Sequence, residues 1–329
     1  MIIVTLYHKA DCHLCEEVEE MLTDLQAESP HHLVKIDIEG DEVLKSQYAE
    51  NIPVIAAGPY TLSAPFTRQD LQVALNATQE IKQARDGDSN TIRPVKLSAA
   101  DRITEFFSNR YMLVFNLVVF IYVGLTFLAP ALMKVGLPGP AKVIYTVYSP
   151  LCHQLGFRSF FIFGEQPFYP RRLASVPGVQ SYEELISGDT ISILEARRFI
   201  GDENLGYKVA LCERDIAIYG AILLFGLLFA ATGKRIKSLP WYIWILIGLV
   251  PIGLDGTSQL PSLGASIFPD WLPIRESTPF LRVLTGGLFG LTTAWYLYPY
   301  VEESMRDNHQ ILARKKAIAE QTADLDEAG

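Results

Sequence analysis

The sequence predicts two parts of different fold class: an α/β domain over residues 1–83, and an all-α polytopic membrane domain over residues 111–300 with about four transmembrane helices. In the first part, short apolar runs alternate with amphipathic helical segments in the order β-α-β-α-β-β-α. In the second part, four long apolar segments follow one another. Residues 84–110 are predicted to form a linker and an interfacial helix, and residues 301–329 a cytoplasmic tail.

The elements of the first part follow from their residue patterns. Apolar runs predict strands over residues 2–7, 33–38, 51–56 and 60–63. Helical spacing and capping residues predict helices over residues 14–25, 41–48 and 67–78. The first of these helices has one apolar face, which its own sheet would bury. The residues of this face are Leu14, Val18, Met21, Leu22 and Leu25. The third strand begins near Pro53, a position where a strand tolerates the missing N–H.

Two cysteines, Cys12 and Cys15, stand at the start of the first predicted helix. The free N–H groups and partial positive charge of a helix N-terminus favour a thiolate at the first sulfur. The second sulfur, one turn further on, can attack a mixed disulfide and release the partner. The alternative is half of a zinc site, but residues 1–83 contain no second Cys-x-x-Cys. His31 and His32 are adjacent in a predicted strand and would point to opposite faces. We therefore predict thiol–disulfide chemistry.

The motif Cys12-His13-Leu14-Cys15, followed by Ile52-Pro53-Val54, resembles the glutaredoxin-like branch of the thioredoxin fold. The resemblance implies that Cys12 is the nucleophile, Cys15 the resolving thiol and Pro53 a cis-proline that helps to bind extended thiol substrates. It also implies a thiol or disulfide protein, or a low-molecular-weight thiol, as the partner. Where glutaredoxins carry a Gly-Gly and acidic pair for glutathione, this chain has Gly58-Pro59 and then residues 63–65, Ser-Ala-Pro.

Charge separates the two parts and limits the partners. Residues 1–83 carry 5 Lys and Arg against 14 Asp and Glu, a net charge of −9, whereas the remaining residues hold 23 of each sign. An acidic domain of this kind excludes nucleic acid as its partner on electrostatic grounds. The start of the chain runs directly into a predicted strand and lacks the pattern of a signal peptide, so we expect this domain to stay in the cytoplasm.

The second part contains four predicted spans, over residues 111–133, 216–232, 241–254 and 280–300. Basic clusters precede the first span, separate the second from the third, and follow the last. All three clusters fall on one side if there are four spans, which predicts a protein of the plasma membrane with both termini cytoplasmic. The loop over residues 134–215 then faces outward. Within it, residues 143–164 are interpreted as a short interfacial or re-entrant helix ending near Pro150, because His153 and Arg158 would be costly inside a fifth span.

Several motifs of the second part resemble an uncharacterised family of predicted integral membrane proteins. They are Cys152-His153-Gln154, Arg158-Ser159-Phe160-Phe161, Cys212 with Arg214, Asp255-Gly256 with Gln259, Glu276-Ser277-Thr278, Arg282 and Thr285-Gly286. The resemblance covers roughly residues 111–300 and implies no known activity. That family usually has Cys-x-x-Cys where this chain has Cys and Asp at 212 and 215.

Three interpretations of Cys152, His153, Cys212 and Asp215 stay open. The two cysteines would suit a disulfide on an oxidising outer face. The four side chains together also provide the ligand types of a zinc site, which makes zinc the candidate cofactor of the membrane domain. The third interpretation is that both cysteines simply pack as small apolar residues.

Further candidates are Arg214, Asp255, Gln259, Glu276 and Arg282, near the outer ends of the predicted spans. Ionisable residues at membrane depth commonly line a cavity and mark function, although they can also merely cap a helix above the hydrocarbon. The small residues Gly286 and Gly290 have the spacing that lets membrane helices pack closely.

Together these patterns predict a membrane-anchored thiol–disulfide oxidoreductase with a cytoplasmic Cys-x-x-Cys. Its membrane domain would either relay electrons through Cys152 and Cys212 or serve only as an anchor. The partners are then a thiol or disulfide compound and the lipid bilayer. The alternative is a transporter or metal-binding membrane protein with an attached redox regulatory domain.

Overall fold

The computed structural model describes residues 1–86, 97–186, 191–260 and 275–327. It divides into two compact units: Met1–Arg110 with Glu303–Gly329, and Tyr111–Glu302. The helices α4 (Ala99–Lys134) and α11 (Pro279–Glu327) contribute to both units. Part of the predicted linker, residues 87–96, lies outside the described residues.

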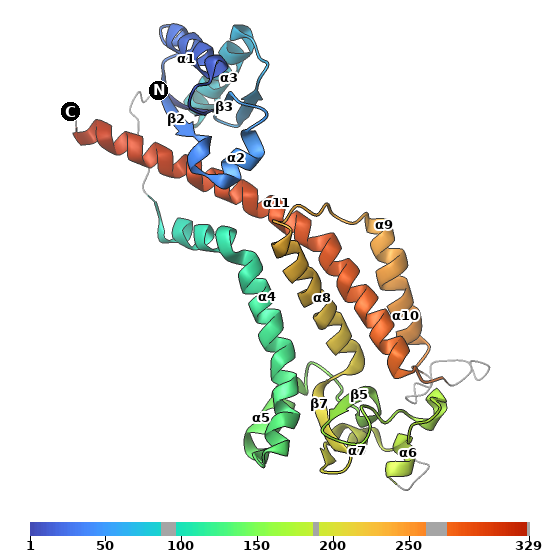
Figure 1. Ribbon diagram of the computed structural model, residues 1–329. Helices are drawn as coiled ribbons and strands as arrows, with labels where there is room; N and C mark the ends of the chain where they lie inside the picture. The colour runs from blue at the N-terminus through green and yellow to red at the C-terminus, as the bar shows by residue number, and fades with distance from the viewer. Residues whose placement is uncertain (87–96, 187–190, 261–274, 328–329) are drawn as a thin grey trace. The chain divides into compact units, whose positions relative to one another are not determined.

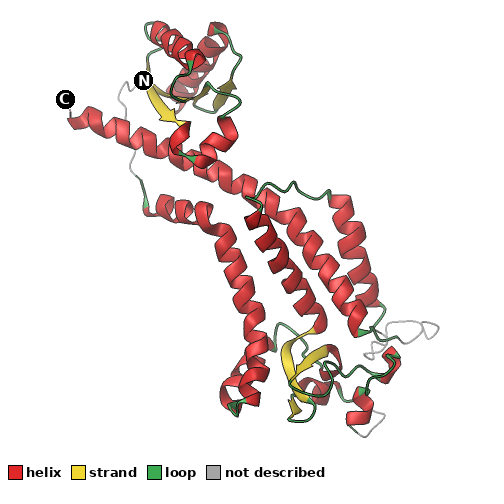
Figure 2. Ribbon diagram, viewed as in Figure 1, coloured by secondary structure: helices red, strands yellow, loops and turns green. Residues whose placement is uncertain are grey.

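The first unit contains the predicted α/β order (Figure 2). Its elements are β1 (Ile2–His8), α1 (His13–Leu25), β2 (His31–Asp37), the 3-10 turn η1 (Ile38–Gly40), α2 (Glu42–Tyr48), β3 (Val54–Ala57), β4 (Tyr60–Ser63) and α3 (Arg68–Asp86). The strand order in the sheet is β2-β1-β3-β4, with β1 parallel to β2 and antiparallel to β3, and β4 antiparallel to β3. The third helix continues to Asp86, beyond its predicted end at Thr78, because no proline or glycine interrupts residues 79–86.

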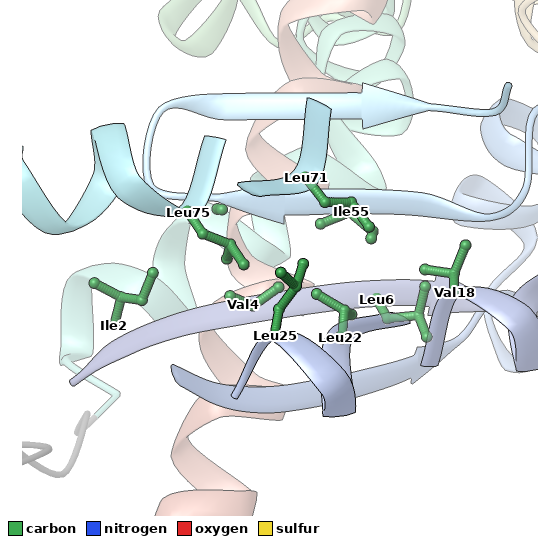
Figure 3. Packing of buried hydrophobic residues seen from close by; sticks show 10 residues of the cluster. Ile2, Val4, Leu6, Val18, Leu22, Leu25, Ile55, Leu71 and Leu75 are labelled. Atoms are coloured by element: carbon green, nitrogen blue, oxygen red, sulfur yellow. The ribbon is translucent and has the colours of Figure 1, made fainter. Parts of the chain in front are cut away.

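One face of this sheet packs against α1 and α3. Figure 3 shows Val18, Leu22 and Leu25 of α1 beside the strand residues, with Leu71 and Leu75 of α3 completing the layer. Most of the predicted apolar face of the first helix is therefore buried by its own sheet, while Leu14 at its start is exposed. Alternation along β1 places its other residues on the opposite face.

The opposite face of the sheet carries a second apolar cluster. Tyr7, Val54 and Ala56 of the sheet pack there with Ile38 and Leu44, and Ala313 of α11 packs against this cluster. Near this contact, Arg314 Nε of α11 donates a hydrogen bond to Thr5 Oγ1 at 3.1 Å. The C-terminal part of α11 is thus an additional element of the first unit (Figure 1).

Two polar residues cap the start of α4. Ser98 and Asp101 cap each other, with Ser98 N donating to Asp101 Oδ2 at 2.6 Å and Asp101 N donating to Ser98 Oγ at 3.2 Å. The predicted interfacial helix and first span form one helix without a break, since no helix-breaking residue separates them. Lys315 of α11 pairs with Asp101 at 2.6 Å and so joins this helix start to the tail.

The second unit is mainly helical. Besides α4 and α11 it contains α8 (Glu213–Ala231) and a helical run formed by α9 (Trp241–Ile243), the π-helical segment η4 (Trp244–Leu249) and α10 (Val250–Thr257). Two helices, α4 and α8, are long and apolar enough to cross a membrane, and Trp241–Thr257 is a shorter apolar helix. These three helices coincide with predicted spans, while the total of four transmembrane helices stays a prediction.

A small sheet makes the all-α description of the second unit incomplete. Its strands β5 (Ser159–Ile162), β6 (Gly201–Asp202) and β7 (Gly206–Cys212) pair in the order β5-β7-β6. The same loop region contains the short helices α5 (Pro138–Tyr148), α6 (Tyr182–Leu185) and α7 (Ile193–Arg198). Because β7 is buried along most of its length, it lacks the alternating pattern that would identify a half-exposed strand.

Close packing of α8 against α11 depends on two glycines of α11. A Cβ added at Gly286 would lie 2.7 Å from the carbonyl oxygen of Arg214, and one added at Gly290 would lie 2.1 Å from that of Ile218. A Cβ at Gly287 would have no neighbour within 4 Å. The predicted role of the Gly286 and Gly290 spacing in helix packing is therefore confirmed.

Candidate functional site

The N-terminal candidate site is a disulfide at the start of α1. Cys12 and Cys15 are bonded to each other, with their Cα atoms 5.2 Å apart. Cys12 is the N-cap residue of α1, and its Sγ accepts a hydrogen bond from the backbone N–H of Cys15 at 3.2 Å. A sulfur in this position lies next to the unpaired N–H groups of the helix terminus, where a negative charge is stabilised.

The two sulfurs differ in accessibility. Cys12 is partly exposed, whereas Cys15 is 4% exposed and lies among the buried residues of α1. Between them, Leu14 is 54% exposed, although it was predicted to share the buried face of the helix. A partner can therefore reach Cys12 and touch an apolar side chain beside it, while Cys15 is screened.

The surroundings of this pair match the sequence predictions in two respects. The Ile52–Pro53 peptide bond is cis and stands directly before β3, as the resemblance implies. The surface of α1 next to the pair is acidic: Glu16 and Glu17 are exposed, and Glu17 pairs with His13 at 3.1 Å.

The second unit contains a cluster of two thiols and a carboxylate. Ligand atoms of Cys152, Cys212 and Asp215 all lie within 4.8 Å of one another. Both cysteines are free thiols, and the backbone N–H of Cys212 donates a hydrogen bond to Cys152 Sγ at 3.3 Å. A hydrogen bond with Cys152, together with burial, raises the pKa of the Cys212 thiol well above its usual value. His153, the fourth predicted ligand, is exposed and is not part of this cluster.

Buried polar contacts hold the turn that carries Cys152. The side-chain amide of Gln154 donates to the carbonyl oxygens of Tyr145 and Ala210, at 2.9 and 3.0 Å. Lys208 Nζ donates to the carbonyl oxygen of Gln154 at 2.7 Å. Burial lowers the pKa of the Lys208 amine to about 7. These contacts connect α5 to β7 and fix Cys152 relative to Cys212.

A network of buried charges lies in the same unit. The guanidinium of Arg282, which is 2% exposed, donates to Glu213 at 3.2 Å, to Gln259 at 3.4 Å and to Glu276. Arg158 Nε also donates to Glu276, at 2.8 Å. Because each buried carboxylate faces at least one guanidinium, the charges compensate one another.

Asp255 is the centre of a second group of contacts. Its Oδ2 pairs with Arg214 at 2.5 Å and accepts from Ser277 Oγ at 2.9 Å, and its Oδ1 pairs with Arg275 at 3.3 Å. Gln259 Nε2 donates to the Asp255 backbone carbonyl at 2.5 Å. The candidate Arg214 is thus brought to Asp255, 41 positions later in the sequence, and Gln259 lies four residues after Asp255.

A cavity of about 360 Å³ connects these groups within the second unit. Its lining includes Cys152, His153, Cys212, Asp215, Arg214 and Arg282. Sequence reasoning missed Glu213, which pairs with Arg282, although its position in the first turn of an apolar helix was a signal. Glu276 and Asp255 were identified, but their partners could not be assigned from sequence.

Comparisons with known proteins cover both units. Residues 3–81 match the family model described as "Glutaredoxin-like domain (DUF836)", and residues 203–296 match "Predicted membrane protein (DUF2085)". The second match includes Cys212 and Asp215, whereas Cys152 and His153 lie before it.

Two individual proteins are similar to this chain. An uncharacterized protein of Methanocaldococcus jannaschii is 28% identical over 160 residues, which make up 47% of this chain and 67% of that protein. The X-ray structure of a structural-genomics target protein from X. campestris is 33% identical, with a TM-score of 0.21, and the match covers 22% of this chain and 96% of that one. By the two family matches, the chain joins an N-terminal glutaredoxin-like domain to a C-terminal domain of a family of predicted membrane proteins.

Proposed function

We propose that this chain is a membrane-anchored thiol–disulfide oxidoreductase whose reacting groups are Cys12 and Cys15. The observation that carries the proposal is the pairing of a partly exposed sulfur at a helix N-terminus with a screened sulfur one turn further on. This arrangement separates the attacking thiol from the resolving thiol.

The reaction proceeds in two exchanges. When the pair is reduced, the Cys12 thiolate attacks a partner disulfide, forms a mixed disulfide and releases one partner sulfur as a thiolate, which takes up a proton. The Cys15 thiolate then attacks Cys12 Sγ, closes the Cys12–Cys15 disulfide and releases the second partner sulfur. Two electrons pass from the pair to the partner, and the reverse sequence oxidises a dithiol.

The surface around Cys12 indicates which partners suit this site. Leu14 provides an exposed apolar contact, and Glu16 and Glu17 give the neighbouring helix surface a negative charge. A protein thiol or disulfide flanked by apolar and basic residues would complement it, because opposite charges steer encounter. The glutaredoxin-like family match supports a thiol or disulfide partner.

The second unit would hold this domain at a membrane. The helices α4 and α8 are long and apolar enough to span, and only 22% and 17% of their apolar windows are buried within the protein. Their apolar side chains therefore require another apolar environment, and a bilayer fits the family of predicted membrane proteins matched by residues 203–296. We propose that this membrane is the plasma membrane and that both termini are cytoplasmic, an orientation that the three basic clusters support.

A second candidate function is supported by the cluster of Cys152, Cys212 and Asp215. Two thiols and a carboxylate are side chains that commonly bind metal ions. They favour a metal-binding membrane protein in which the glutaredoxin-like domain has a regulatory role. Electron relay to Cys152 and Cys212 would instead require these thiols to cycle through a disulfide.

A redox titration of the full chain in detergent tests the proposed function. We expect Cys12 and Cys15 to titrate together as a two-electron couple, read by mass after alkylation, and the protein to catalyse thiol exchange with a model disulfide. The variants Cys12→Ser and Cys15→Ser should abolish the couple, and Cys212→Ser should leave it in place. Retention of exchange activity in Cys12→Ser would refute the proposal.

A further inference from the structure

We propose that Cys152, Cys212 and Asp215 bind one zinc ion, with the fourth coordination position open to the adjoining cavity. The site is separate from the Cys12–Cys15 pair and adds a metal-binding activity to the proposed redox function. Each of the three residues supplies one ligand atom, and these atoms lie within 4.8 Å of one another.

Local structure holds the three ligands in place. Cys212 is the N-cap residue of α8 and Asp215 lies in the first turn of the same helix, so the two side chains are at the same helix end. Cys152 is buried in the cluster that includes Tyr148 of α5 and Leu211 of β7. The donors are therefore fixed by a helix terminus, a strand and a buried turn, which is the rigidity that a metal site requires.

The spacing fits zinc better than a disulfide. With Zn–S bonds near 2.3 Å, two thiolates on a tetrahedral ion stand about 3.8 Å apart, within the range of this cluster. The sulfurs of Cys152 and Cys212 are free, whereas those of Cys12 and Cys15 are bonded. The N–H of Cys212 that donates to Cys152 Sγ is the kind of backbone hydrogen bond that supports a metal-bound thiolate.

Charge also points to a cation beside Asp215. The neighbouring carboxylates of Glu213 and Asp255 are paired with Arg282 and Arg214. Among the described residues, no lysine or arginine is paired with Asp215, which instead lies next to two thiols. A divalent cation held by all three would compensate the carboxylate where no protein cation does.

Two thiolates and one carboxylate suit zinc, because soft thiolates exclude magnesium and calcium and the oxygen ligand is common in zinc sites. Three protein ligands leave one position for water or a small molecule, the arrangement of a reactive rather than a purely structural zinc site. The cavity of about 360 Å³ that these residues line gives such a molecule room, and His153 lines it too without joining the cluster.

Metal analysis of the full chain, purified in detergent without added chelator, tests this inference. We expect about one zinc ion per chain in the unmodified protein, since three ligands hold zinc tightly. Cys152→Ser, Cys212→Ser and the nearly isosteric Asp215→Asn should each lower the zinc content after dialysis by about tenfold or more. Asp215→Cys should retain zinc, because it replaces one ligand with another. Retention of zinc in this variant would show that the loss of zinc in Asp215→Asn is not caused by misfolding.

Two further variants act as matched controls. His153→Ala should keep its zinc, and loss of zinc there would overturn the three-ligand assignment. The double variant Cys12→Ser/Cys15→Ser should also keep its zinc. This control distinguishes a failure of the proposed redox function from a failure of the metal site. A protein with a Cys152–Cys212 disulfide by mass spectrometry, or one that carries iron or copper in place of zinc, would overturn the inference.

Discussion

At the scale of single residues, the chemistry that we propose for the N-terminal site rests on a difference between two neighbouring sulfurs. Cys12 caps α1 and is partly exposed, whereas Cys15 faces the core of the domain. Both sulfurs lie within one helical turn, so the partial positive charge of the helix N-terminus affects both of them. They differ in how far a partner can reach them. This difference in access supports our proposal that Cys12 is the attacking group.

Alkylation of the reduced chain measures this difference. We expect iodoacetamide to modify Cys12 at least about tenfold faster than Cys15, because the second thiol is screened from solvent. The rate at each sulfur is read by mass spectrometry of peptides taken at successive times. The variant Cys15→Ser is the matched control, because it gives the alkylation rate of Cys12 alone. Equal alkylation rates at both sulfurs in the native chain would contradict the assignment.

Sequence identified most residues of both sites but not how they pair. Cys-x-x-Cys at a helix start is a local pattern, so Cys12 and Cys15 were readable from the chain, whereas the cis form of Pro53 was implied by the family resemblance. The contact of Arg282 with Glu213 joins residues separated by 69 positions, and no local pattern encodes it. Ligand convergence at Cys152 and Cys212 likewise depends on the fold.

At the scale of elements, local periodicity predicted the first unit well and the outward loop poorly. The strand β4 matched its prediction residue for residue, because turn formers on both sides delimit it. The small sheet of β5, β6 and β7 was not predicted, since its strands are short or buried throughout. A strand that is buried on both faces has no alternation of polar and apolar residues.

The contact between α8 and α11 gives an element-scale prediction. Gly290→Ala should lower the free energy of unfolding by about 1–3 kcal/mol, because its Cβ would clash with the Ile218 carbonyl oxygen and force the helices apart. Gly287→Ala is the matched control, since its Cβ has no neighbour within 4 Å. Thermal unfolding in detergent compares the two variants. Equal stability would show that α11 does not pack on α8 through Gly290.

At the scale of the whole molecule, the chain combines two units of opposite character. The glutaredoxin-like domain carries a net charge of −9 within residues 1–83, and the remaining residues are neutral overall. The second unit exposes apolar side chains along α4 and α8, a surface that fits the bilayer location proposed above. A reactive thiol pair held at a membrane would meet partners confined to the same surface.

The predicted topology can be read with reporter fusions. Fusions after Lys237 and at the C-terminus should report a cytoplasmic location, because the basic clusters favour that side. A reporter inserted at Gly178, in the loop between α5 and α8, should report an outside location. A C-terminus that scores outside would overturn both the four-span count and the orientation.

Trapping of a mixed disulfide tests the central claim, that Cys12 attacks and Cys15 resolves, most directly. Full chains carrying Cys15→Ser or Cys12→Ser are expressed in cells, quenched with acid and run on non-reducing gels. We expect Cys15→Ser to accumulate a covalent adduct that mass spectrometry maps to Cys12, because the resolving thiol is gone. Cys12→Ser should trap no partner. Equal trapping by the two variants, or an adduct that maps to Cys15 in Cys12→Ser, would contradict the account.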